Sequence, residues 1–175
     1  MKNKKMMLKK FFIINKKGFS LIEMMVVVVV MGLIILGLVT FFTGGTRSWI
    51  TGQSQLSAQR NARQAMDWMV REIREAAYIK DSSTPIIIDF YTPFDGDISY
   101  SFSLSDRDLK RGISPVINNV QSLVFTYFDN NGNLVDPPDK NRISKVHIYL
   151  QVDVDKDSNP DITLNSDINL RNFGL

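Results

Sequence analysis

Cysteine is absent from this 175-residue chain, and histidine occurs once, at His147. The lack of cysteine excludes disulfide bonds, thiol catalysis and cysteine-ligated metal sites. A single histidine cannot complete a histidine-based metal set, and neither a phosphate-binding loop nor a nucleophile motif accompanies it. We therefore expect neither an enzyme nor a bound cofactor, and we expect His147 on the polar face of a strand.

Acidic residues are missing from the first 18 residues, which hold seven lysines. The chain has a net charge of +3, so residues 19–175 carry a net charge of −4. A mildly acidic body offers no basic surface for nucleic acid, and we expect no direct nucleic-acid binding. The basic head is instead typical of a signal that keeps the N-terminus in the cytoplasm.

Residues 19–42 form a long apolar run in which Glu23 is the only charged residue. A helix of this length spans about 36 Å, which exceeds the roughly 30 Å of a bilayer's hydrocarbon core. The run is too long for an ordinary signal peptide, and no small-residue cleavage site follows it. A transmembrane helix in the lipid bilayer is therefore expected. A carboxylate there is unfavourable unless it has a partner. Cleavage after Gly18 would create one, because the new amine at Phe19 would lie about one helical turn from Glu23 and would be mostly protonated.

The stretch KKGFSLIEMMVVVV resembles the class III signal of type IV prepilins and type II secretion pseudopilins. The resemblance implies that a prepilin peptidase/methyltransferase cuts between Gly18 and Phe19 and methylates the Phe19 amine. It also implies that Glu23 pairs with the Phe19 amine of a neighbouring subunit during assembly. Major pilins usually have proline where this chain has Thr40, which favours a minor subunit.

The rest of the chain predicts an α+β fold, with a long N-terminal helix packed on an antiparallel β-sheet. We divide the chain into a cleaved leader (1–18), a membrane and assembly helix (19–43), an amphipathic continuation (44–80) and a β domain (81–175). Gly44 and Gly45 are expected to bend or break the helix, because each glycine costs about 1 kcal/mol relative to alanine. The buried stripe of the continuation should comprise Ala62, Met66, Met69, Ile73 and Ala76.

Period-two patterns after Pro85 predict five segments. They are a strand at 85–91, a hairpin at 97–114 that turns at 106–108, a strand ending at Phe128 before an Asn131-Gly132 turn, a strand with Val146, Ile148, Leu150, Val152 and Val154 on one face, and a final strand after residue 160. This half more weakly resembles PilW-type minor pilins and J-type minor pseudopilins, through FTYFDNNG and the terminal INLRN.

Asp153, Asp155, Asp157, Asn159 and Asp161 occupy every second position of DVDKDSNPD. Oxygen ligands at such spacing are typical of calcium loops, although Ser158 and Leu164 replace the glycine and the bidentate acid of an EF-hand. The alternative is an exposed acidic hairpin, with Asp153 and Asp155 on the polar face of a strand.

We predict a minor pilin or pseudopilin, a structural subunit that assembles into or primes a type IV pilus-like filament. The resemblance leaves open a pilus, a type II secretion pseudopilus and a DNA-uptake pseudopilus. It implies a single pass through the bacterial inner membrane with the C-terminal domain outside the cytoplasm, and it implies contacts with other pilin-type subunits and an inner-membrane assembly platform. The alternative is an uncleaved, signal-anchored binding or adhesion domain.

Overall fold

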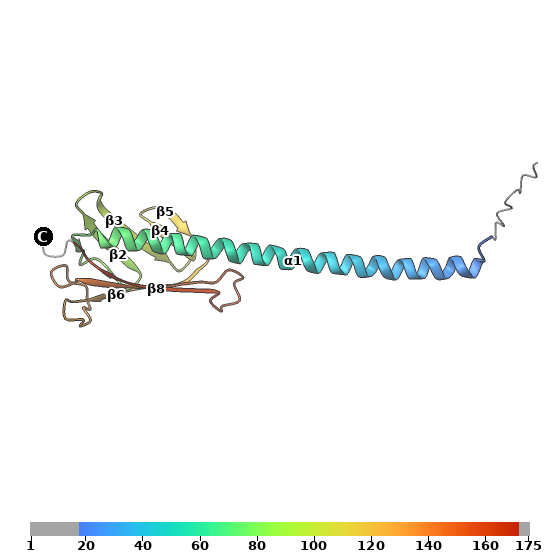
Figure 1. Cartoon of the computed structure of the whole chain (residues 1–175). Coiled ribbons are helices and arrows are strands. Elements are labelled where there is room, and N and C mark those ends of the chain that lie inside the picture. Colours follow the sequence, from blue (N-terminus) through green and yellow to red (C-terminus); the bar gives the residue numbers. More distant parts are fainter. Residues whose placement is uncertain (1–17, 172–175) are drawn as a thin grey trace, which may run out of the picture. The chain divides into compact units, whose positions relative to one another are not determined.

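The computed structural model describes residues 18–171 of the chain. The chain divides into two compact units, one ending at Ser48 and the other beginning at Trp49. Apart from Gly18, the predicted leader lies outside the described residues. The element order is α1 (Leu21–Arg74), β1 (Tyr78–Ile79), β2 (Ile87–Thr92), β3 (Gly96–Ser103), β4 (Asp108–Arg111), β5 (Ser114–Ile117), β6 (Val120–Phe128), β7 (Lys145–Val152) and β8 (Ile162–Asn169) (Figure 1).

Helix α1 continues through Gly44 and Gly45, so the predicted break is wrong. Both glycines lie in open space with negative φ, and their cost of about 1 kcal/mol each is spread over a long cooperative helix. Thr46 bonds through its hydroxyl to the carbonyl of Phe42, within the same turns. The helix ends at Arg74 rather than at residue 80, because the chain turns into β1.

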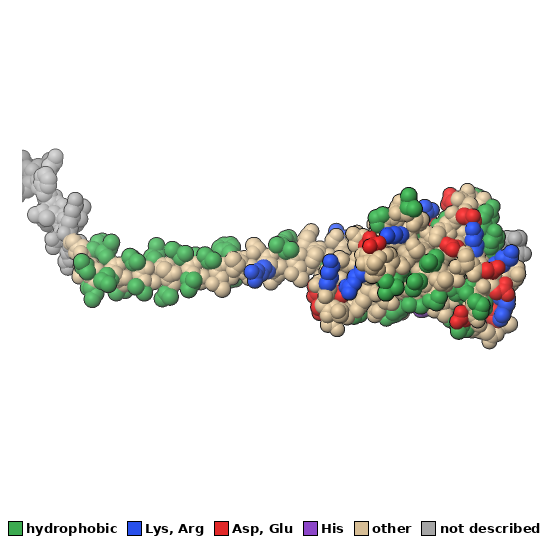
Figure 2. Space-filling model, turned by 180° about the vertical axis from the view of Figure 1, so that it is seen from behind, with side chains coloured by type: hydrophobic (Ala, Val, Ile, Leu, Met, Phe, Trp, Pro, Cys, Tyr) green, Lys and Arg blue, Asp and Glu red, His purple; other side chains and the backbone are tan. Residues whose placement is uncertain are grey.

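In the first unit, every described residue from Gly18 to Ser48 is exposed. Its side chains are predominantly apolar, as the hydrophobic colouring along this part of α1 shows (Figure 2). The helix is long and apolar enough to cross a membrane, and none of its most apolar window is buried within the protein. Such a helix must find its apolar contacts in lipid or in other chains.

The second unit holds two antiparallel sheets where the sequence predicted one. Sheet A has the order β1-β2-β3-β4-β5, and sheet B has the order β6-β7-β8. The chain leaves sheet A at Asn119, whose φ of 60° turns the backbone between β5 and β6. The predicted α+β class with a long helix and antiparallel strands is confirmed, but the strands are divided between two sheets.

The predicted hairpins are present. Strands β3 and β4 pair antiparallel, and β7 pairs with both β6 and β8. The turn after Phe128 forms at Asn131-Gly132, where Gly132 has a φ of 81°. A further hairpin between β4 and β5 turns at Gly112, with a φ of 59°, and was not predicted.

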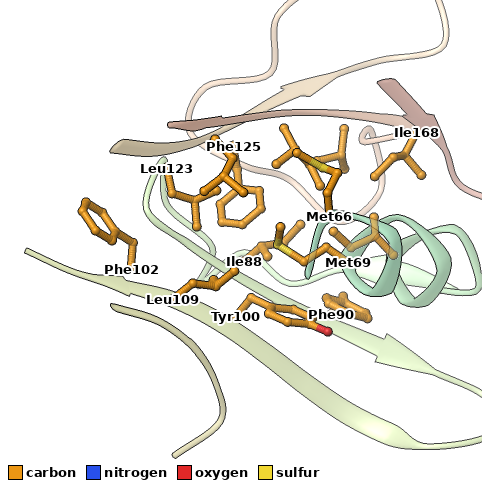
Figure 3. Packing of buried hydrophobic residues seen from close by; sticks show 14 of the residues in the cluster. Met66, Met69, Ile88, Phe90, Tyr100, Phe102, Leu109, Leu123, Phe125 and Ile168 are labelled. Atoms are coloured by element: carbon orange, nitrogen blue, oxygen red, sulfur yellow. The ribbon is translucent and has the colours of Figure 1, made fainter. Parts of the chain in front are cut away.

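The core lies between the second half of α1 and the two sheets. All five predicted stripe residues are buried, and Ala65 is buried with them. Met66 and Met69 project between side chains from both sheets, with Ile88 and Tyr100 from sheet A and Phe125 from sheet B among them (Figure 3). Burying a side chain of this size contributes about 1.5–3 kcal/mol, so the stripe fixes the helix on the domain.

Candidate functional site

The N-terminal candidate site begins just before α1. Gly18, Phe19 and Ser20 precede the helix, and the amide of Met24 donates to the carbonyl of Ser20 at 3.1 Å. Phe19 is exposed, as is the glycine before it. The peptide bond that the sequence predicts to be cut therefore lies outside regular secondary structure, where a peptidase can reach its backbone.

Glu23 lies in the first turn of α1. The unpaired amides at a helix N-terminus carry a partial positive charge, which favours a carboxylate at this position. Glu23 is exposed, and no cation from residues 18–171 lies within 4.0 Å of its carboxylate. Within the described part of one chain, the positive end of the helix is therefore the only favourable charge near this carboxylate.

Thr40 lies inside α1, where major pilins usually carry proline. Its hydroxyl donates to the carbonyl of Leu36 at 2.8 Å, and the hydroxyl of Thr43 donates to that of Val39 at 2.9 Å. These bonds satisfy polar groups within the helix itself, which lipid requires. A threonine here leaves the backbone ladder intact, whereas proline would remove a donor.

Residues 14–39 match the family described as the prokaryotic N-terminal methylation motif. The match covers Gly18, Phe19 and Glu23 together with most of the apolar run. The N-terminal segment is that of a type IV pilin-like or pseudopilin precursor. A search of curated proteins finds no match to the chain.

The methylation motif is the signal that prepilin peptidases recognise, and pilins that carry it assemble with other pilins. The match supports the resemblance for the N-terminal segment and its membrane helix. The cut at Gly18, the methylation of Phe19 and the pairing of Glu23 stay predictions.

The acidic loop after β7 is the second candidate site. Strand β7 ends at Val152, so Asp153 isn't on the polar face of a strand as the sequence suggested. Its carboxylate is fully buried and accepts the amides of Lys156 at 2.7 Å and Ser158 at 3.1 Å. Arg107 Nη1 lies 3.7 Å from the same group. The exposed-hairpin alternative is therefore wrong for Asp153, which anchors the loop from inside.

The loop brings together three of the five predicted calcium ligands. Carboxylate oxygens of Asp153, Asp155 and Asp161 lie within 4.8 Å of one another. Asp157 and Asn159 instead bond to each other, with Asn159 Nδ2 3.1 Å from Asp157 Oδ2. The Asp157 amide lowers the pKa of Asp155, but burial and the neighbouring carboxylates outweigh it and raise that pKa overall.

Oxygen donors of this kind suit a hard cation such as calcium. However, Asp161 already accepts the amide of Val154 at 2.7 Å and the side-chain amide of Gln55 at 3.3 Å. The carboxylates of Asp153 and Asp161 thus already accept hydrogen bonds from amide groups of the protein itself. The arrangement explains the loop's conformation without an ion, and calcium binding stays a prediction of the sequence.

His147 lies on the outward face of sheet B, opposite Asp167 in the register of β7 and β8. Its Nδ1 donates to Asp167 Oδ1 at 2.7 Å, and Lys145 Nζ lies 3.2 Å from Asp167 Oδ2. The hydrogen bond from His147 and then the one from Lys145 hold the pKa of Asp167 below its usual range. The predicted polar-face position of His147 is confirmed, and its contacts are those of a cross-strand pair.

A partly buried polar contact joins α1 to sheet A and was not predicted from the sequence. Tyr100 Oη donates to Glu72 Oε2 at 2.8 Å, and Arg111 Nε donates to the same oxygen at 3.0 Å. Burial, followed by the hydrogen bond to Glu72, raises the pKa of Tyr100. The three residues come from elements far apart in the chain, so no local spacing could have indicated their contact.

Proposed function

We propose that the mature chain begins at a methylated Phe19 and acts as a non-enzymatic subunit of a type IV pilus-like filament. The observation that carries the proposal is the methylation motif at residues 14–39, which opens a helical segment whose apolar side chains are all exposed as far as residue 48. In the membrane, lipid acyl chains cover these apolar side chains. In a filament, the corresponding helices of neighbouring subunits cover them.

In this proposal, Glu23 fixes the axial position of each subunit relative to its neighbour. A carboxylate moved from the membrane surface into a bundle of apolar helices loses hydration, and leaving it unpaired there costs several kcal/mol. The amine of a neighbour's Phe19 offsets that cost at one axial position only. The first turn of α1 holds the carboxylate close to its own chain end, so each subunit presents both members of the pair.

We further propose that the subunit is a minor one, made with its leader in the cytoplasm and its second unit on the opposite side of the inner membrane. Thr40, which preserves an unbroken helix where major pilins carry proline, supports the minor role. Pilus, type II secretion and DNA-uptake filaments share this N-terminal chemistry. An uncleaved anchored adhesion domain is the alternative, and it requires neither Glu23 nor a cut at Gly18.

The variant Glu23→Gln tests the pairing. It should insert into the membrane at least as well as the wild type, because it removes a charge from the apolar run. It should nevertheless be depleted from sheared filaments. Asp108→Asn, which neutralises a carboxylate on β4, is the matched control and should be incorporated normally. Incorporation of Glu23→Gln at the wild-type level would refute the pairing.

A further inference from the structure

The β2–β3 hairpin presents an aromatic and acidic surface at its turn. Phe94 is 84% exposed at the tip. The rings of Tyr78 and Tyr91, near the turn end of β2, stack with centroids 5.5 Å apart. The hairpin's turn carries two aspartates, Asp95 and Asp97, and no basic residue. Lys80 is bound to Asp97 at 2.8 Å, whereas the side chain of Asp95 is exposed at the tip. We call residues 78, 91 and 94–97 the hairpin surface.

The outward face of α1 in the same unit has the opposite charge. Steps of three and four residues place one row of exposed side chains along the helix, opposite the buried stripe. Four arginines and one aspartate make its net charge +3, and Trp68 borders it at 40% exposure. The row, which we call the arginine face, consists of Arg60, Arg63, Asp67, Arg71 and Arg74.

The two surfaces complement each other in chemistry but are separated along one chain. Tyr91 accepts a backbone hydrogen bond from Ala77, so the hairpin lies beside the end of α1. Arg60 and Arg63 precede Arg74 by roughly 16–21 Å along the helix axis, at 1.5 Å per residue. Among the described residues, neither arginine has a carboxylate within 4.0 Å. Aromatic rings next to carboxylates bind guanidinium groups through cation–π and ionic contacts together.

We propose that the hairpin surface of one copy of this chain docks on the arginine face of a second copy, around Arg60 and Arg63. This contact rests on the proposed function, because filament subunits lie side by side with their helices in the same sense. Two copies displaced along the helix axis would bring Phe94 and Asp95 of one beside the arginines of the other. Such a contact joins unlike surfaces, so it sets two adjacent copies head to tail.

The absence of cysteine makes the contact testable in the full chain by cross-linking in membranes. Differently tagged Phe94→Cys and Arg60→Cys chains, made in the same cells with the filament machinery, are treated with a short bismaleimide. The mixed sample should yield a cross-linked dimer that carries both tags. Each variant made alone should yield none, because a contact between unlike surfaces never brings identical positions together.

The control is Ile113→Cys, which places the thiol on a 97% exposed residue of another turn of sheet A. Cells that make Ile113→Cys and Arg60→Cys together should give no cross-linked dimer. If this dimer is as abundant as the one between Phe94→Cys and Arg60→Cys, the proposal is overturned. Adding Asp95→Lys to the Phe94→Cys chain should abolish the dimer. Adding Arg63→Glu to the Arg60→Cys chain as well should restore it, and failure of this rescue would contradict the charge pairing.

The N-terminus of the same samples is measured by mass spectrometry, so the two proposals fail separately. Chains that are cut at Gly18 but give no mixed dimer overturn this contact and leave the filament function standing. Chains that give the dimer but keep the leader support the contact and refute the filament function. A dimer formed by either cysteine variant made alone would overturn the proposal that the partner surface is the arginine face of a second copy. So would a cross-link of Phe94→Cys to an unrelated protein without any cross-link to Arg60→Cys.

Discussion

The contact of Tyr100 and Arg111 with Glu72 predicts a measurable coupling between α1 and sheet A. Replacing Tyr100 with phenylalanine removes a 2.8 Å hydrogen bond to a charged acceptor. Such bonds contribute about 1.5–3 kcal/mol to the free energy of unfolding. Glu72 keeps Arg111 as a partner at 3.0 Å, so we expect a loss at the lower end, about 1.5 kcal/mol.

Replacing Glu72 with leucine has a different physical origin. Tyr100 is fully buried, so its hydroxyl would be left without an acceptor, at a cost of about 1–3 kcal/mol. Arg111 is 43% exposed and can turn to water, so it adds little. When both residues are replaced, neither polar group remains buried and unpaired. The double variant should therefore lose about 1–2 kcal/mol less than the sum of the two single variants.

The assay is denaturant unfolding of the full chain in detergent micelles, followed by tryptophan fluorescence, to which Trp49 and Trp68 of the same helix contribute. Asp67→Asn, at an exposed position one turn earlier than Arg71, should change stability by less than about 0.5 kcal/mol and serves as the control. The coupling would be refuted if the loss of stability in the double variant equals the sum of the two single-variant losses within about 0.5 kcal/mol.

Two further predictions concern the polar contacts of sheet B and its loop. Asp153→Ala should lower the free energy of unfolding by about 1–3 kcal/mol, because the amides of Lys156 and Ser158 lose their buried acceptor, and equal stability in denaturant titrations would refute its anchoring role. The lowered pKa of Asp167 contributes stability that is present above the unfolded value of about 3.9 and is lost as the pH falls through the folded value. Asp167→Asn should therefore unfold at lower denaturant than wild type at neutral pH, and the two should converge in acid; a gap that stays constant with pH would contradict this reasoning.

The elements that the sequence predicted are those with strong local periodicity. The stripe from Ala62 to Ala76 repeats at helical steps, and β7 alternates over Val146, Ile148, Leu150 and Val152, so each face is determined by its own residues. The Asn131-Gly132 turn was equally local, because a positive φ there favours glycine.

The elements that the sequence missed depend on long-range packing or on small energy balances. The division into two sheets follows from a turn at Asn119, which local propensity doesn't distinguish from an ordinary loop. The unbroken helix at Gly44 reflects a cost too small to overcome the hydrogen bonds on either side. The buried carboxylate of Asp153 looked like an exposed one because its partners, Lys156 and Ser158, are backbone amides that no side-chain pattern indicates.

The N-terminal signal was predictable because its chemistry is linear. A lysine-rich head, Gly18, an aromatic residue and Glu23 stand at fixed spacing in front of or within an apolar run, and the family match covers this stretch from residue 14 onward. The hairpin surface and the arginine face were not predictable as a pair, because the place of the hairpin beside the end of α1 depends on how the strands pack on the helix.

Mass spectrometry of the intact chain, isolated from the membranes or filaments of its own host, tests the account most directly. We predict a mature protein that starts at Phe19 with a methyl group on its amine and lacks all 18 preceding residues. A product that still starts at Met1, or one that is cut beyond Gly45, would contradict the filament function.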